Sequence, residues 1–214
     1  MVLRPILYPS VHLTLPPRLC GGIELYVRAW AAGSYAMDWD TAFDKRDKAT
    51  HRFTIADTRG RLDLTVPIAK PASSRCRWSE IGVSTHGAWW DVHRVALESA
   101  YGRTPYFEFY IDRFLPMLTV GVTDRYPRLC DLASAWDEQI ADILGLTRDN
   151  QREATEHDSR LKEAADLQLP PYRQVRASRL GFLPGLSVLD LIFNLGPESQ
   201  IYLNDLANTL YNDL

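Results

Sequence analysis

The sequence has neither paired cysteines nor a long apolar run. Its three cysteines, Cys20, Cys76 and Cys130, stand far apart and form no Cys-x-x-Cys pair, which favours reduced thiols over a disulfide framework or a zinc knuckle. Four prolines interrupt the apolar start, so it lacks the continuous stretch of a signal peptide. No apolar run approaches the roughly 20 residues that cross a bilayer. We therefore expect a cytoplasmic protein without membrane insertion.

The sequence also lacks an excess of positive charge and the common catalytic motifs. Its 24 Lys and Arg against 27 Asp and Glu give a net charge of −3, so no nucleic-acid partner is expected. There is no Walker loop, GxGxxG, GxSxG or HExxH motif, which removes the commonest nucleotide-binding and hydrolase interpretations. Asp38 and Asp40 lack a third ligand, so no metal site is predicted. The pattern identifies no cofactor and no oligomeric state.

Periodicity predicts one α+β domain over residues 1–214. Strands are predicted at 34–39, 51–57 and 61–68, the last two joined by a tight turn with Gly60, and shorter strands at 2–8, 76–83 and 172–177. Helices are predicted at 23–32, 88–102, 105–118, 133–145, 187–195 and 200–214. We expect a mixed or antiparallel sheet from the N-terminal half, packed by helices of the C-terminal half. The polar segment 147–166 predicts either an exposed helix or a mobile insert.

The predicted helix at 88–102 carries the first candidate site. His93 is a candidate general base near neutral pH, Arg94 a candidate anion ligand and Glu98 a candidate orienting group. The structural alternative is a hydrogen-bonded core histidine, because His93 shares its stripe with Trp90 and Tyr101. In that case Arg94 and Glu98 form an ordinary surface ion pair. The residues alone leave both interpretations open.

Two further groups of residues are candidates for ligand binding. The basic segment 45–52 includes Lys45, His51 and Arg52, which suit phosphate or carboxylate, although nearby aspartates also fit a solvated surface. Asn194 ends a predicted helix, where its amide either caps the helix or reaches a ligand. The arginines at 173, 176 and 179 would scatter over both faces of the predicted strand, so we assign no anion site to them.

Two long motifs resemble the WbqC-like family. DVHRVALESAYGRTPYFEFY resembles the family's His, Tyr and Pro-Tyr/Phe-Phe-Glu tract, and YRQVRASRLGFLPGLSVLDLIFNLGPES resembles its closing motif. LTVPI matches a strand of the family that ends in Val-Pro, and the likeness spans roughly residues 1–200. Carried over by position, the first motif places His93, Tyr101 and Glu108 in one block, and the second places Asn194 in another.

The resemblance implies a function in surface-polysaccharide biosynthesis. Some family members are similar to proteins encoded beside O-antigen genes, and glycine transfer onto a sugar has been suggested for one branch. We therefore expect a transferase acting on a sugar or sugar nucleotide, with acyl or aminoacyl transfer as the reaction. The alternative is a non-catalytic module that binds a sugar-linked ligand or a partner. The family's Lys and Asn-Arg fall on Lys45, His51 and Arg52, with His51 in place of the Asn.

Overall fold

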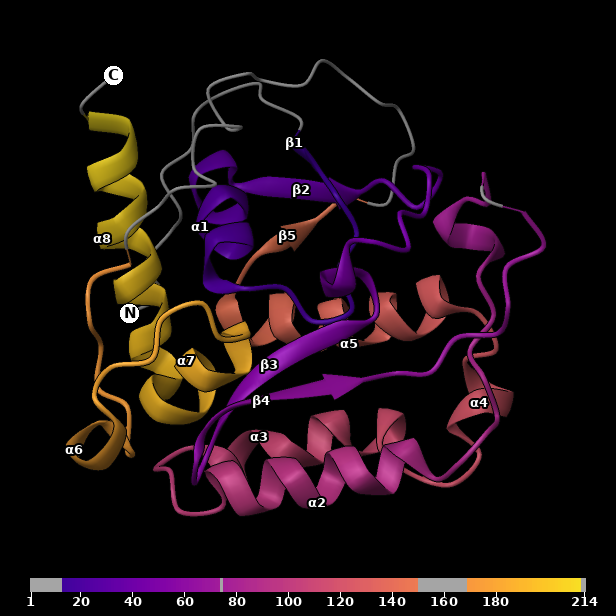
Figure 1. The fold of residues 1–214 in the computed structure, drawn as a ribbon. Coiled ribbons are helices and arrows are strands. Elements are labelled where there is room, and N and C mark those ends of the chain that lie inside the picture. Colours follow the sequence, from indigo (N-terminus) through magenta and orange to yellow (C-terminus); the bar gives the residue numbers. More distant parts are fainter. Residues whose placement is uncertain (1–12, 74, 150–168, 213–214) are drawn as a thin grey trace.

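The computed structural model describes residues 13–73, 75–149 and 169–212, and it has the predicted α+β class (Figure 1). Three short strands form a parallel sheet in the order β1-β2-β5: Leu13–Leu15, Ser34–Met37 and Thr147–Arg148. The remaining two, β3 (Arg52–Asp57) and β4 (Gly60–Thr65), form an antiparallel hairpin. The hairpin matches the prediction. The parallel sheet differs from it, because its third strand comes from residues 147–148 and not from the N-terminal half.

Helices account for most of the remaining regular structure. The eight α-helices in the described part are α1 (Ile23–Ala32), α2 (Trp89–Tyr101), α3 (Phe107–Phe114), α4 (Val122–Arg125), α5 (Leu129–Leu144), α6 (Ala177–Leu180), α7 (Val188–Leu195) and α8 (Ser199–Asn212). Six of them confirm the helices predicted from apolar periodicity, with small differences at their ends. Only the four-residue helices α4 and α6 were not predicted. None of the helices described has the length and apolar composition that crossing a membrane requires.

The hairpin lies at the centre of the packing, between α5 and the pair α2 and α3 (Figure 1). Along β3, Phe53 and Ile55 are buried, and Leu64 faces Phe53 across the hairpin. The Phe53 ring contacts Trp136 of α5 and His93 of α2, with centroids 5.7 Å and 5.8 Å apart. Burial of these large side chains removes apolar area from water and fixes the hairpin between the helices.

Two predicted strands are wrong. Residues 76–83 instead form a 3₁₀ turn at Trp78–Glu80, followed by isolated bridges at Gly82 and Val83, because their backbone bonds go to separate segments. Residues 172–177 run as an irregular segment into α6. That segment bonds to side chains of α7 and not to a neighbouring strand, so strand periodicity does not apply to it. The predicted strand at 2–8 and most of the polar segment 147–166 lie outside the described residues.

Candidate functional site

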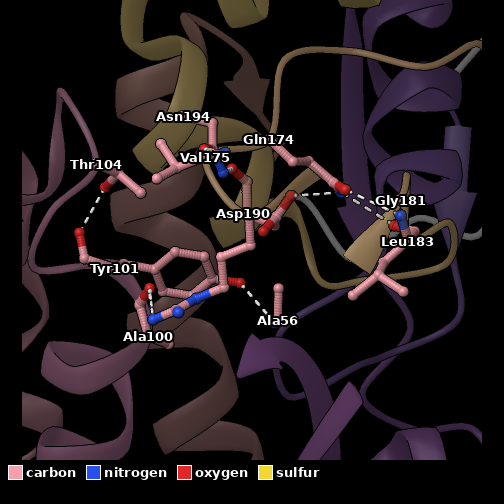
Figure 2. Close-up of a pocket in the computed structure, with 11 residues that line it drawn as sticks. Ala56, Ala100, Tyr101, Thr104, Gln174, Val175, Gly181, Leu183, Asp190 and Asn194 are labelled. Atoms are coloured by element: carbon pink, nitrogen blue, oxygen red, sulfur yellow. Dashed lines mark hydrogen bonds between the residues drawn. The ribbon is translucent and has the colours of Figure 1, made fainter. Parts of the chain in front are cut away.

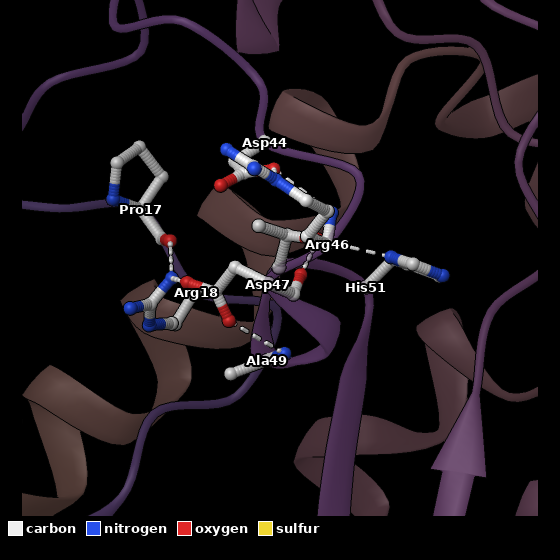
Figure 3. Close-up of polar contacts among 8 residues, drawn as sticks. Pro17, Arg18, Asp44, Arg46, Asp47, Ala49 and His51 are labelled. Atoms are coloured by element: carbon white, nitrogen blue, oxygen red, sulfur yellow. Dashed lines mark hydrogen bonds and ion pairs between the residues drawn. The ribbon is translucent and has the colours of Figure 1, made fainter.

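The basic segment 45–52 forms the loop that leads into β3 (Figure 3). Lys45 is exposed, and Arg46 pairs with the Asp44 carboxylate at 3.3 Å. His51 Nδ1 lies within hydrogen-bond distance of the Thr50 hydroxyl, at 2.9 Å. Partial burial and then the charges of neighbouring cations lower the pKa of the His51 ring. The loop therefore places its charges among local partners, as in a solvated surface.

Arg52 is also engaged within the hairpin. Its Nε donates to the Thr65 hydroxyl at 2.8 Å, and a terminal nitrogen donates to Asp63 Oδ2 at 3.0 Å. These are the residues opposite and diagonal to it on β4. Nearby, Arg18 pairs with Asp47 at 2.7 Å, which neutralises a further charge of the loop (Figure 3). Arg52 therefore links β3 to β4, and it lines neither of the two cavities described below.

His93 is enclosed in the core. Its side chain is 3% exposed, its ring packs edge-on against Phe53 and Trp89, and Nε2 lies 3.2 Å from the Thr65 carbonyl. Since a carbonyl only accepts, Nε2 carries the proton of the neutral ring. Burial lowers the pKa of His93 to about 4, and the bond to Thr65 opposes this shift only partly. This environment favours the core-histidine interpretation that the sequence left open.

The predicted partners of His93 lie on the surface. Arg94 pairs with Asp91 at 2.7 Å and with Glu98 at 3.4 Å, one helical turn apart on α2. All three side chains are substantially exposed, so water and salt screen both pairs and they contribute little to stability. Glu108 is exposed in the first turn of α3. Neither Glu98 nor Glu108 lines the cavities described below.

The closing motif instead folds into a buried polar network around Asp190 of α7 (Figure 2). Asp190 Oδ2 accepts hydrogen bonds from the Tyr172 hydroxyl at 2.5 Å and from Gln174 Nε2 at 2.9 Å. Gln174 also donates to the Leu183 carbonyl at 3.0 Å and accepts from the Leu183 N–H at 2.9 Å. The irregular segment 172–176 and the loop after α6 are thus both attached to one helix.

Asn194 and Tyr101, both predicted site residues, belong to the same region. Asn194 Oδ1 accepts from the Val175 N–H at 2.9 Å, and its amide donates to the Asp190 carbonyl at 2.7 Å. The Tyr101 hydroxyl accepts from the Ala56 N–H at 3.1 Å. Burial, followed by the charge of Asp190, raises the pKa of Tyr101 well above its ordinary value. Three segments far apart in the sequence therefore meet here.

A small cavity of about 10 Å³ lies among these residues, which is room for about one water molecule (Figure 2). Asp190 lines it and is 1% exposed, and its Oδ1 makes no hydrogen bond with any residue of the described part. Burial raises the pKa of the Asp190 carboxyl, and the nearby side chains of Tyr172, Tyr101 and Gln174 oppose that shift. The carboxylate thus holds the network together at one oxygen and leaves the other unused.

A second cavity of about 200 Å³ adjoins the first, and we call it the arginine cavity. Both cavities are lined by Ala100, Val175 and Arg176. The arginine cavity lies between the β3–β4 turn, the end of α2 and the segment that enters α6, and its other lining residues are Thr58, Arg103, Ser178, Arg179 and Leu180. Three arginines and two hydroxyl-bearing residues among these lining residues give the cavity a cationic character.

The structure explains why two of these arginines were not predicted as a site. Arg176 and Arg179 would point apart on a strand, but 177–180 is a helical turn, and a spacing of three places them on the same side. Of the predicted residues, Tyr101 and Asn194 line the small cavity, whereas His93, Arg52 and Lys45 line neither. The Tyr-x-Gln-Val and Leu-Asp-Leu motifs contained the missed residues Tyr172, Gln174 and Asp190. A charged residue within an apolar helix was the available signal.

Fold and cavities together define an α+β protein with a cationic candidate binding site. The model of the WbqC-like protein family matches residues 31–167, which is more than half of the chain, and the chain belongs to this family. The closing motif at 172–199 lies beyond the matched range. Neither the curated proteins nor the solved structures contain a match. Within the described residues, no three His, Cys, Asp or Glu side chains are grouped as a metal site requires.

Proposed function

We propose that this protein is a transferase that acts on a sugar-linked substrate in surface-polysaccharide biosynthesis and binds that substrate in the arginine cavity. The observation that carries the proposal is the position of the cavity, directly beside the buried network that contains Tyr101 and Asn194. The volume of about 200 Å³ accommodates part of a sugar-linked ligand, with the remainder outside. Membership of the WbqC-like family supports the pathway context.

The described residues suggest how a ligand would be held. The hydroxyls of Thr58 and Ser178 supply donors and acceptors that suit the hydroxyls of a sugar. Val175 is 41% exposed and lines both cavities, so its side chain lies where a ligand would enter. Asn194, predicted as an oxyanion donor, already donates its amide to the Asp190 carbonyl. Asn194 therefore supports the proposal only by its position, because its side chain holds the backbone of Val175 beside the cavity.

The test combines ligand binding with a search for product. Isothermal titration with a panel of nucleoside diphosphate sugars and free sugars measures binding, and mass spectrometry after incubation with acyl and aminoacyl donors detects transfer. Val175→Trp is expected to abolish binding, because the larger ring fills the entrance. Val95→Trp on α2 is the matched control, since Val95 is 49% exposed and lines neither cavity. Absence of binding by every sugar-linked compound, or binding unaffected by Val175→Trp, would overturn the proposal.

A non-catalytic binding module is the second candidate, and the burial of His93 favours it. A general base has to reach the proton that it removes, and a ring that is 3% exposed beside Phe53 and Trp89 offers no open face. This candidate predicts sugar-ligand binding that depends on Val175 without any transfer product. Product formation that depends on Val175 would exclude it.

A further inference from the structure

We infer that the arginine cavity is a phosphate-binding site, formed by Arg103, Arg176 and Arg179. This inference rests on the proposed function, because it names the charged group by which the substrate is anchored in the same cavity. The three guanidinium groups come from two separate parts of the chain, one following α2 and two at α6. None of the residues lining the cavity is acidic.

The three arginines lack the carboxylate partners that most other arginines of the structure have. Arg18, Arg46, Arg52 and Arg94 pair with aspartates, but within residues 13–73, 75–149 and 169–212 no carboxylate forms an ion pair with any of the three arginines of the cavity. Three cations around one hollow repel each other, and a bound anion would relieve that repulsion. The three positive charges therefore favour binding of an anionic ligand in the arginine cavity.

Arg176 is held in place before any ligand arrives. One terminal nitrogen donates to the carbonyls of Ser99 and Ala100, at 2.8 Å and 3.0 Å, in the last turn of α2. These carbonyls are otherwise unsatisfied helix-end acceptors, and the cation also complements the negative end of the helix. Arg176 Nε is buried and has no acceptor in the described part of the chain. The side chain is thus preorganised and retains an unused donor.

The number and type of donors favour phosphate over carboxylate. A phosphate offers three terminal oxygens and up to two negative charges, which match several guanidinium groups at once, whereas a carboxylate offers two oxygens and one charge. The hydroxyls of Thr58 and Ser178 line the same hollow and can also donate to phosphate oxygens. A volume of about 200 Å³ is small for a whole ligand and suits its phosphate or diphosphate portion.

The experiment titrates the full chain with inorganic phosphate and pyrophosphate at low ionic strength, with acetate and a neutral sugar for comparison. Arg103→Gln and Arg179→Gln remove two exposed guanidinium groups, so the fold is retained and near-ultraviolet circular dichroism checks that it is. The matched control is Arg173→Gln, an exposed arginine of the same segment that lines neither cavity. We expect pyrophosphate to bind, the double variant to bind about tenfold or more weakly, the control to be unchanged, and the affinity to fall as salt is added.

The outcomes separate this inference from the proposed function. Failure of both phosphates to bind, acetate binding as tightly as phosphate, or an equal loss in Arg173→Gln would each overturn the phosphate site. If neutral sugars then still bound in a manner that depends on Val175, the proposed function would stand without it. If phosphates bound through Arg103 and Arg179 while no sugar-linked compound bound, the phosphate site would stand and the proposed function would fall.

Discussion

The Tyr172 hydroxyl donates a hydrogen bond of 2.5 Å to Oδ2 of Asp190, and this contact attaches the irregular segment before α6 to helix α7. A carboxylate that is 1% exposed needs such donors, because burying an unpaired neutral polar group already costs roughly 2 to 7 kcal/mol and an unpaired charge costs far more. One turn further along α7, Asn194 holds the next part of the segment through the Val175 N–H. The position of Arg176, the following residue, thus depends on two polar side chains of an otherwise apolar helix.

Asn194→Ala is expected to destabilise the fold by about 1 to 3 kcal/mol, because it leaves the Val175 N–H without its acceptor and removes the side-chain donor to the Asp190 carbonyl. Urea unfolding, followed by tryptophan fluorescence, measures the change. Asn208→Ala on α8 is the control, since Asn208 is only half-buried, and its expected effect is within about 0.5 kcal/mol. Equal effects at the two positions would contradict a special role for Asn194.

The burial of His93 predicts a loss of stability on acidification. Its pKa is about 4 in the folded protein and near 6.5 when the chain unfolds, so between these values the unfolded state binds the proton and the folded state does not. Stability therefore falls as the pH is lowered from about 6.5 to 4, by on the order of 3 kcal/mol from this residue. Below the folded pKa no further loss arises from it.

His93→Gln tests this dependence, since an amide keeps a donor for the Thr65 carbonyl and does not titrate. We expect the variant to be less stable than wild type at pH 7 and to approach or exceed it at pH 4. Urea unfolding at four pH values gives the two curves. The matched control is His86→Gln, which removes an exposed imidazole and should retain the wild-type slope. Parallel curves for His93→Gln and wild type would rule out the buried neutral ring as the cause.

The elements that could be predicted from the sequence are those that local periodicity determines. The helices and the β3–β4 hairpin have a repeating apolar pattern and a turn with Gly60, so their own residues specify them. The strand β5 has two residues, Thr147 and Arg148, which is too few for any pattern. The segment 172–176 forms its structure through Asp190 and Asn194, which lie well beyond it in the chain. No local signal could show those contacts.

The residues of the candidate site also fall into two groups, those that the sequence could indicate and those that it could not. A family motif indicates Tyr101, and both a motif and the end of a predicted helix indicate Asn194; the two residues line the small cavity. The arginine cavity is not evident from the sequence, because Arg176 and Arg179 lie at the helical turn α6, whereas the pattern predicts a strand over 172–177 and no helix after it. His93 lies on the apolar stripe of α2, and the sequence could not decide whether that stripe faced the core or a pocket. Such decisions depend on tertiary packing.

A single methyl group added at Gly196 is expected to destabilise the fold strongly. Its φ of +54° lies in the left-handed region, and an added Cβ would lie 2.4 Å from the Tyr106 ring. Gly196→Ala is therefore expected to lower the free energy of unfolding by roughly 3 kcal/mol, from backbone strain together with the clash. Gly121→Ala is the control, because Gly121 also has a positive φ, of +85°, but has no atom within 4 Å of the added Cβ. Thermal or urea unfolding should show the larger loss at Gly196, and similar losses would mean that Tyr106 moves aside freely.

Removal of the Arg148 guanidinium is expected to destabilise the fold, and more so as the pH rises. Its Nε lies 2.8 Å from Oδ2 of Asp137, which is 2% exposed, in an ion pair rather than a well-directed hydrogen bond. Asp137 Oδ1 accepts from the hydroxyls of Tyr26 and Tyr35, at 3.0 Å and 2.9 Å. Burial raises the pKa of the Asp137 carboxyl, and Arg148 is the largest influence against that rise. Removing the guanidinium leaves a buried charge without its counter-ion.

Arg148→Met is accordingly expected to cost about 3 to 5 kcal/mol at pH 8, where the unpaired carboxylate must either stay charged or take up a proton against the pH. At pH 5 the folded variant binds that proton more readily, because the folded pKa is raised above the unfolded value, so the loss is smaller. Urea unfolding of wild type and variant at the two pH values measures the difference. Arg113→Met is the control, since Arg113 pairs with the exposed Asp142 and should change stability by less than about 1 kcal/mol at either pH. If Arg148→Met lowers the free energy of unfolding equally at pH 5 and pH 8, the loss comes from the packing of the arginine and not from the charge of Asp137.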